Sequence, residues 1–325
     1  MAKAFEDTHH LRATMTGGMA ARRFTATVLR VHAPWRSLAG SPYRERATRL
    51  MGTNTVDPRE TAKFEEDAAS WWDETKGPFA PLHAMNPTRC VFVRDVLVRH
   101  FQGSVDHPGV GKDPARPLAG LKLLDVGCGG GILCESLARM GAMVTGVDAG
   151  GANVEIAIAH CKLDPAIEER ITYRAAAAET LLEEGASFDA VCSLEVVEHV
   201  SDPDSFVEAL SGLAKPNGAV VVSTLNRTAR AAALVIAFAE RVVQWVPPGT
   251  HEFAKFITPE ELVALATRAG LETMEMAGMS YTPPLPGNGN GATGGRWSLT
   301  DDLGVNYIAY FAKKKGGKIG VGTNE

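Results

Sequence analysis

The stretch that decides the fold is LLDVGCGGG, residues 123–131. An apolar run leads into Asp125, a turn containing Gly127 and Gly129 follows, and an amphipathic segment begins after the turn. A turn between a buried strand and a helix can bind a ligand, because glycine lets backbone amides approach closely and the helix N-terminus attracts negative charge. The stretch therefore predicts a cofactor pocket at the end of a strand in an α/β sheet.

The order of the acid and the glycines indicates which cofactor fits. D-x-G-x-G-x-G differs from the G-x-G-x-x-G spacing that binds the pyrophosphate of a nicotinamide dinucleotide. Asp125 precedes the first glycine, where its carboxylate can fix the turn or bind an ammonium group. The pattern favours a cofactor that carries an amino acid. A tight strand-to-helix turn without a ligand is the alternative interpretation of the glycines alone.

Two further positions extend the predicted pocket. Asp148 ends the next strand-like run, about 20 residues downstream, where an acid can accept hydrogen bonds from both hydroxyls of a ribose. Ala178 and Glu179 follow the third run, where they would border an adenine ring. A solvated strand-end aspartate and an ordinary surface glutamate are the alternatives for each position taken singly. Three such features after three successive strands strengthen the prediction of a cofactor pocket.

The pattern of apolar runs predicts the fold class. Strand-like runs alternate with amphipathic segments, as in a parallel sheet with crossover helices. The chain is therefore expected to be an α/β protein. The runs are residues 121–126, 143–148, 171–175, 188–194, 219–224, 271–277 and 306–312.

The N-terminal region differs in charge from the remainder. Residues 1–50 carry nine basic and three acidic side chains, whereas the remaining residues carry 24 basic and 35 acidic ones. Residues 1–58, basic and without an apolar core, resemble a disordered mitochondrial or chloroplast transit peptide, with a plain basic tail as the alternative. The acidic body argues against nucleic acid as a partner.

The rest of the chain divides by composition. In the helical pattern after residue 58, Phe64, Ala68, Trp71 and Trp72 share one face, and a second helix is expected from about Pro87. The expected divisions are an N-terminal helical lid over 59–102, a linker over 103–117, a cofactor-binding domain over 118–314 and a disordered tail over 315–325. That domain contains an insertion at 228–256 and a Gly/Pro-rich loop at 283–296.

The cysteines and the apolar runs indicate which metal sites and which kinds of membrane contact are expected. The five cysteines show no CxxC spacing, which predicts reduced, structural thiols without a zinc site. No run approaches the roughly 18 apolar residues of a membrane span. Residues 228–247 nevertheless combine an apolar stretch with Arg230, Glu240 and Trp245, a pattern typical of a helix lying in a membrane interface. An ordinary buried helix covering the sheet is the alternative.

The E-x-x-E-H pattern after the fourth run brings together the candidate catalytic residues. On a helical turn, Glu195, Glu198 and His199 would share one face. Two carboxylates and an imidazole could hold a divalent cation that lowers the pKa of a substrate hydroxyl. His199 could instead act as a general base, or the residues could cap a helix and form salt bridges. The residues alone leave these alternatives open.

Four further segments carry a family resemblance. FEEDAASWWDETKGPFAPLHAMNPTR (64–89), SLEVVEHVSDPDSF (193–206), STLNRT (223–228) and VPPGTHEFAKFITPEEL (246–262), with the glycine turn, resemble the ubiquinone biosynthesis O-methyltransferases. The resemblance covers roughly residues 60–313. It implies a seven-stranded class I methyltransferase sheet with the last strand antiparallel and an N-terminal helical extension. Residues 103–117 and 287–295 look like insertions relative to compact bacterial members.

The resemblance implies a reaction, a cofactor and site residues. The reaction is methyl transfer from S-adenosylmethionine to ring hydroxyls of polyprenylated catechols or quinols. Gly127 would lie in the cofactor turn, Leu194 would border adenine and Arg89 of NP-x-R would close over the cofactor. The resemblance also gives Asp148 the ribose and makes Glu195, Glu198 and His199 ligands of Mg²⁺.

A polyprenyl substrate implies where the protein works. Such a substrate resides in a bilayer, so the enzyme is expected to bind the matrix side of the mitochondrial inner membrane peripherally. Other ubiquinone-synthesis proteins are candidate partners. Two rival hypotheses remain: a methyltransferase for another soluble phenol or acid, and a non-catalytic scaffold subunit. A nicotinamide dehydrogenase is disfavoured by the glycine spacing.

Overall fold

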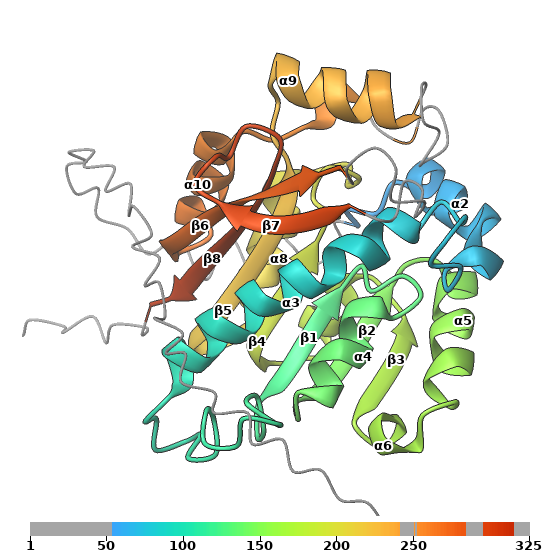
Figure 1. The fold of residues 1–325 in the computed structure, drawn as a ribbon. Coiled ribbons are helices and arrows are strands. Elements are labelled where there is room, and N and C mark those ends of the chain that lie inside the picture. Colours follow the sequence, from blue (N-terminus) through green and yellow to red (C-terminus); the bar gives the residue numbers. More distant parts are fainter. Residues whose placement is uncertain (1–53, 241–249, 251, 284–294, 315–325) are drawn as a thin grey trace, which may run out of the picture.

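The computed structural model describes residues 54–240, 250, 252–283 and 295–314, with side chains in the first range described as far as 236. They form a mixed sheet with helices on both faces (Figure 1). The strand order is β3-β2-β1-β4-β5-β8-β6-β7. The strands are β1 Lys122–Val126, β2 Met143–Asp148, β3 Ile171–Ala175, β4 Phe188–Leu194, β5 Ala214–Leu225, β6 Leu271–Thr282, β7 Arg296–Thr300 and β8 Asn306–Lys313.

Strands β1 to β5 pair in parallel, and β8 lies antiparallel between β5 and β6. The predicted class and the antiparallel last strand are therefore confirmed. Parallel strands buried on both faces need near-continuous apolar residues, and β4 and β5 have them. This is why apolar runs located the strands in the sequence.

The described residues form a sheet of eight strands, one more than the seven expected. The eighth strand, β7, pairs antiparallel with β6 at the edge of the sheet. Trp297 and Leu299 of β7 pack against the core beneath α3, and the Trp297 ring lies 5.4 Å from that of Tyr281. Burial of these two alternating side chains stabilises a short strand that directly follows the Gly/Pro-rich stretch. Arg296, expected at the end of a loop, is the first residue of β7.

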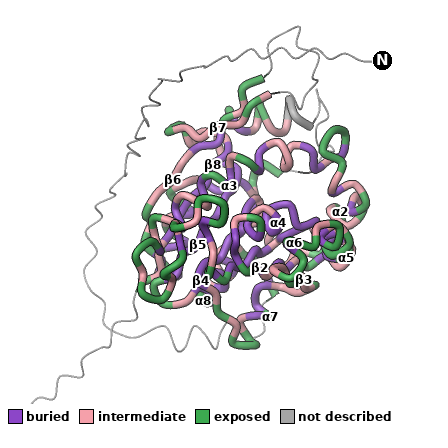
Figure 2. Tube along the Cα trace, turned by 60° about the horizontal axis from the view of Figure 1, so that its bottom comes forward, coloured by how far each residue is buried: buried purple, intermediate pink, exposed green. Residues whose placement is uncertain are grey.

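Helices cover both faces of the sheet, and the buried residues lie between the layers (Figure 2). On one face, Val93 and Leu97 of α3 and Leu137 of α4 contribute to the core; on the other, Leu210 of α8 and Leu262 of α10 do. The first face carries α3 Ala80–Phe101, α4 Ile132–Arg139, α5 Gly151–Cys161 and α6 Pro165–Glu168; the second carries α7 Ala178–Glu183, α8 Pro203–Leu213 and α10 Pro259–Arg268.

The N-terminal segment lies across the sheet edge where β1 and β2 end. Helix α2, Pro58–Glu66, begins after Asp57, whose side chain accepts a hydrogen bond from the Arg59 amide. A short 3₁₀ turn, η1 Ala68–Ser70, follows. The predicted apolar face forms one cluster on α4 and α5, made of Phe64, Ala68, Trp71, Trp72, Phe79, Leu82, Ile132, Ala152 and Ile156.

Helix α3 begins at Ala80, about two turns earlier than Pro87, near which the sequence predicted a new helix. Pro87 lies inside the helix. A proline there removes one backbone hydrogen bond. Burial of Phe92, Val93 and Leu97 against the sheet offsets that loss.

Residues 103–117, predicted to be a linker, pack against the domain. Val110 is 2% exposed, the Gly111 amide donates to the Pro117 carbonyl at 2.9 Å, and His107 lies 3.3 Å from the buried Asp189 carboxylate. The segment is made of turns, as its glycines and prolines predict.

The predicted insertion 228–256 contains α9 Ala229–Ala231, a π-helical stretch η2 Ala232–Glu240 and a short turn η3 Phe253–Lys255. None of the described helices combines the length and the apolar character needed to cross a bilayer. The predicted transit peptide, apart from 54–58, the tail 315–325, and most of the loop 283–296 lie outside the described residues.

Candidate active site

A cavity opens where β1, β2 and β4 end, between the glycine turn and α2. Its empty space, counted together with its open mouth, is about 870 Å³. Gly127, Gly129, Asp148 and Leu194 line it from the sheet, and Phe64 lines it from α2. The cavity therefore lies where a parallel sheet ordinarily binds ligands.

The glycine turn has a backbone that only glycine adopts readily. Gly127 and Gly129 have φ values of 74° and 52°. A Cβ on Gly127 would lie 2.4 Å from a Val196 methyl carbon, and one on Gly129 would lie 2.3 Å from the Trp71 ring. The Gly129 amide donates to Asp148 Oδ2 at 2.9 Å. The turn is thus held by β2 and covered by a tryptophan.

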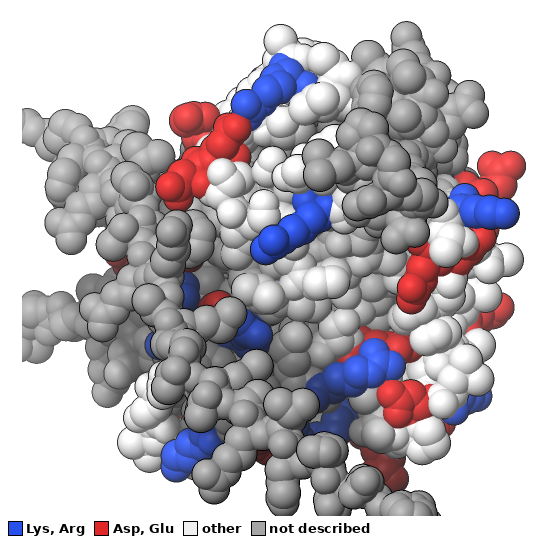
Figure 3. All heavy atoms as spheres, viewed as in Figure 1, with Lys and Arg blue, Asp and Glu red and all other residues white. Residues whose placement is uncertain are grey.

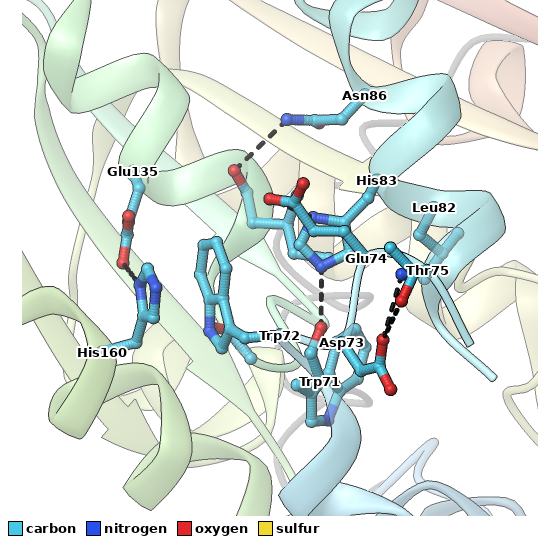
Figure 4. Close-up of polar contacts among 12 residues, drawn as sticks. Trp71, Trp72, Asp73, Glu74, Thr75, Leu82, His83, Asn86, Glu135 and His160 are labelled. Carbon is cyan, nitrogen blue, oxygen red and sulfur yellow. Dashed lines mark hydrogen bonds and ion pairs between the residues drawn. The ribbon is translucent and has the colours of Figure 1, made fainter. Parts of the chain in front are cut away.

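The WWD segment fixes the N-terminal residues onto this turn. Figure 4 shows two of its contacts, the Trp72 ring beside His160 and the Trp71 carbonyl beside His83. Trp71 Nε1 donates to Asn153 Oδ1 at 2.9 Å, and its ring stacks on Phe79 at 3.7 Å. Trp72 Nε1 donates to the Gly130 carbonyl at 3.0 Å, while its ring stacks on His160. The sequence identified both tryptophans as one apolar helix face and missed their contacts with the turn. Two adjacent indoles, each needing a hydrogen-bond acceptor when buried, were the available signal.

Asp148 lies at the cavity wall. Its Oδ1 accepts hydrogen bonds from the Gly150 amide at 2.8 Å and from Asn153 Nδ2 at 3.2 Å, in addition to the Gly129 bond at Oδ2. Burial raises the pKa of this carboxyl. A carboxylate has about four acceptor positions, so these three bonds leave capacity for a hydroxyl group.

Asp125 lies beneath the turn, at 2% exposure. It accepts a hydrogen bond from the Cys134 thiol at 3.1 Å, and burial raises its pKa to about 6. It does not line the cavity as far as the structure describes it. The predicted contact of Asp125 with an ammonium group therefore stays a prediction.

Arg89 lies on α3 and is also buried, at 4% exposure. Its Nη2 donates to Asn86 Oδ1 at 3.1 Å and more weakly to the Leu82 carbonyl at 3.4 Å. Burial lowers the pKa of Arg89, and the nearby charges of Glu195 and Asp125 oppose this effect. Within the described part of the chain, its Nε has no hydrogen-bond partner, and the residue is not part of the cavity wall. Closure of Arg89 over a cofactor stays a prediction.

The residues expected at the adenine side all line the cavity. Ala178 and Glu179 are the first two residues of α7, and Leu194 ends β4. Glu179 is 5% exposed, and Thr55 from the N-terminal segment donates to its Oε1 at 2.6 Å. Thr55 carries no recognisable signal in the sequence; its carbonyl also accepts a hydrogen bond from the Ser201 amide at 2.9 Å.

The expected helical turn at residues 195–199 does not form. Glu195 has a φ of 60°, a left-handed conformation that interrupts a helix, and α8 begins only at Pro203. The i, i+3, i+4 spacing therefore does not place the Glu195, Glu198 and His199 side chains on one helix face.

The two glutamates of E-x-x-E-H contact β5, whereas the histidine contacts α2. Glu195 Oε1 accepts from Ser223 at 2.6 Å, and Glu198 Oε2 accepts from Thr224 at 2.8 Å, both on β5. Burial, and secondly the charge of Glu195, raises the pKa of Glu198 to about 8. Glu198 Oε1 has no partner among the described residues, and Glu198 is outside the set that lines the cavity. Glu195 and His199 line it.

His199 makes its contacts with α2. Its Nδ1 lies 2.9 Å from Glu60 Oε2, and its ring meets the Phe64 ring edge to face at 5.1 Å. Hydrogen bonding from His199 lowers the pKa of Glu60 well below its usual range, helped by Lys255 and Lys63 and opposed by burial. The sequence pattern carries no signal for Glu60, which is separated from His199 by 139 positions.

The chain is similar to known methyltransferases. Residues 107–275 match the family described as "Methyltransferase domain". The mitochondrial ubiquinone biosynthesis O-methyltransferase of Arabidopsis thaliana is 49% identical over 265 residues, 81% of this chain and 76% of that protein. The ubiquinone biosynthesis O-methyltransferase of Azorhizobium caulinodans is 47% identical over 260 residues, 80% of this chain and 95% of that protein.

Among solved structures, magnesium protoporphyrin IX methyltransferase from Synechocystis with bound SAH is 17% identical, with a TM-score of 0.48. The similarity covers 84% of this chain and 95% of that one. The two sequence relatives confirm the family resemblance that the motifs indicated. Each alignment covers more than two-thirds of this chain and of the relative. The chain therefore belongs to the ubiquinone biosynthesis O-methyltransferase family.

Proposed function

We propose that this chain transfers the methyl group of S-adenosylmethionine to a ring hydroxyl of a polyprenylated catechol or quinol in ubiquinone biosynthesis. The observation that carries the proposal is that the glycine turn, Asp148 and His199 line one cavity. A donor held by the turn and Asp148 would meet a phenol beside the imidazole. The names of the relatives support the same pathway.

The reaction needs alignment and removal of one proton. The bound cofactor supplies an electrophilic methyl group on a sulfonium. The phenolic oxygen forms a bond to the methyl carbon as the carbon–sulfur bond breaks and its electron pair stays on sulfur, so no covalent bond to the protein is needed. His199 takes the phenolic proton in this proposal, because an imidazole accepts a proton near neutral pH and this one lines the cavity.

The cofactor contacts follow the cavity wall. We assign one ribose hydroxyl to Asp148 and the adenine to the surface made by Ala178, Glu179 and Leu194. The amino-acid end would face the turn at Gly127 and Gly129, both of which line the cavity. Arg89 and Asp125 lie behind this wall, so their contribution in the proposal is electrostatic.

Mg²⁺ bound by Glu195, Glu198 and His199 stays a prediction of the family resemblance, and the described residues do not fit it. Over the ranges that the structure describes, no three His, Cys, Asp or Glu side chains are arranged to hold a metal ion. Mg²⁺ also prefers oxygen ligands in near-octahedral geometry over imidazole. We therefore assign the proton to His199 and no step to a metal.

The proposed location follows from the acceptor. A polyprenylated substrate requires contact with a bilayer, and we assign this contact to residues 228–247, with peripheral binding at the matrix side of the mitochondrial inner membrane. Leu234, in η2, is 48% exposed. Lys and Arg side chains are interspersed with Asp and Glu on the face drawn in Figure 3. An apolar contact with the bilayer suits this mixed charge better than adhesion by charge alone.

The test is methyl transfer itself. Purified protein is incubated with labelled S-adenosylmethionine and a panel of short-chain prenylated catechols and quinols, soluble phenols and small acids. We expect label in the prenylated catechols or quinols, and a fall of about 10²-fold or more in kcat for His199→Ala. Turnover of soluble phenols alone would point to another acceptor. Binding of cofactor without turnover of any acceptor would indicate a scaffold.

A chelator arm of the same assay tests the metal prediction. If His199 takes the proton without a metal, turnover persists after incubation with EDTA and removal of free cations. Loss of turnover with recovery on adding Mg²⁺ would restore the metal to the E-x-x-E-H segment and contradict our assignment.

A further inference from the structure

We propose that Glu60 is a positioning residue for His199: its carboxylate holds the Nδ1–H of the imidazole and thereby directs the other ring nitrogen, Nε2, toward the reacting hydroxyl. The inference rests on the proposed function of this site and adds to it a residue from the N-terminal segment. Glu60 lies on α2, outside residues 107–275 that match the methyltransferase domain.

The two carboxylate oxygens of Glu60 have different hydrogen-bond partners. Oε2 lies 2.9 Å from His199 Nδ1, whereas Oε1 accepts from Lys255 Nζ at 2.8 Å and from Lys63 Nζ at 3.1 Å. The side chain of Glu60 is 5% exposed. A buried carboxyl with two ammonium groups beside it is ionised, and an ionised carboxylate only accepts hydrogen bonds. Nδ1 must therefore be the protonated nitrogen of His199.

Fixing the proton on Nδ1 has a chemical consequence. In a neutral imidazole one nitrogen donates and the other accepts, so Nε2 becomes the basic nitrogen. When Nε2 takes up a proton, the ring becomes a cation, and the negative charge of Glu60 stabilises it. A carboxylate behind a histidine acts in this way in serine hydrolases, where it orients the ring and sets its tautomer.

Two side chains of helix α2 contact the imidazole of His199. Glu60 and Phe64 are four residues apart, so both project from one side of the helix, and Phe64 contacts the His199 ring edge to face. Glu60 lies in the first turn of α2, where the helix dipole favours negative charge. Lys255 additionally lies 3.3 Å from Glu252 and 3.9 Å from Asp57, which keeps it beside Glu60.

The experiment compares E60Q and E60D with E66Q in the full chain. Glu66 is an exposed acid on the same helix, so E66Q controls for the loss of a charge from α2. We expect E60Q to lower kcat about 10- to 100-fold, the range for groups that orient a functional histidine, while the Kd for S-adenosylmethionine and the Tm change little. E60D, which keeps the charge on a shorter side chain, should recover part of kcat.

A second measurement needs no turnover. Protein labelled with ¹⁵N-histidine, in which the His199 signals are assigned by their loss in His199→Asn, reports which ring nitrogen carries the proton. We expect a protonated Nδ1 in the wild type and in E66Q, and a mixture of tautomers in E60A. This tautomer measurement does not depend on turnover. It would therefore support the positioning role of Glu60 even if none of the tested acceptors is methylated.

Three outcomes would overturn the inference. One is a wild-type kcat in E60Q. Another is a parallel loss of Tm and cofactor affinity in E60Q and E60D, which would make Glu60 merely structural. The third is a wild-type His199 protonated at Nε2 alone. An inactive wild type that shows the Nδ1 tautomer would instead contradict the proposed function and leave the Glu60 contact in place.

Discussion

Asp125 shows how a single residue couples the site to stability. Burial raises its pKa to about 6, above the usual value of about 3.9, so the folded state binds its proton more tightly than the unfolded state does. Between these two values the folded protein loses stability as the pH rises, and the unfavourable contribution stays in full above pH 6. It amounts to as much as about 3 kcal/mol at neutral pH.

Asp125→Asn removes this ionisation. We expect the Tm of the variant to exceed that of the wild type by about 5 °C at pH 7.5 and to approach it at pH 4, measured by calorimetry without ligand. Asp301→Asn, at an exposed position, should leave the Tm unchanged at both values. A Tm below that of the wild type at pH 7.5 would show that the ionised group stabilises the fold. Titration with S-adenosylmethionine on the same samples tells whether Asp125 also contributes to binding.

At the scale of elements, the clearest prediction concerns η2. Leu234 is 48% exposed, whereas Val235 and Ile236 pack against a small cluster with Leu225 and Phe256. The side chain of Phe238, in the same apolar stretch, lies outside the described side chains. Leu234→Glu should therefore weaken binding to liposomes that contain anionic lipid by about tenfold, because it removes an apolar contact and adds a repelled charge. Flotation of the protein with liposomes measures this.

The control for η2 is another exposed leucine. Leu163 is 75% exposed between α5 and α6, so Leu163→Glu adds the same charge at a position where we place no bilayer. Both variants should keep the wild-type affinity for S-adenosylmethionine. If Leu234→Glu binds liposomes as well as the wild type does, η2 is an ordinary helix that covers the sheet and not a membrane contact. Charging Ile236 is a poorer test, because it would also disturb the packing around Phe256.

Across the whole molecule, structural features that depend on local sequence pattern could be predicted, whereas features that depend on tertiary contacts could not. Buried strands need apolar runs, so seven strands and the glycine turn could be identified; β7 could not, because five residues after a Gly/Pro-rich stretch carry little periodic signal. The Glu195–His199 spacing suggested a helix, but a left-handed residue follows β4. Glu60 was invisible, since only folding brings α2 against His199.

The same tertiary contacts imply that ligand binding and docking of the N-terminal segment are linked. Residues 54–79 contribute Thr55, Phe64 and Trp71 to the cavity wall, and they contact the rest of the domain through hydrogen bonds such as Trp71 to Asn153 and Thr55 to Glu179. A ligand that fills the cavity contacts both sides of it, so it disfavours local opening of this segment by mass action.

Hydrogen exchange followed by mass spectrometry measures that linkage. At a concentration of S-adenosylhomocysteine 100 times its Kd, opening should be suppressed by about 2.7 kcal/mol, so exchange of amides in residues 54–79 should slow by about 100-fold. Helix α10, whose described residues do not line the cavity, should change little and serves as the internal control. Uniform slowing in both would indicate global stabilisation. Slowing in neither, with binding confirmed by calorimetry, would mean that the ligand does not touch the N-terminal segment, and the cavity described here would then not be its site.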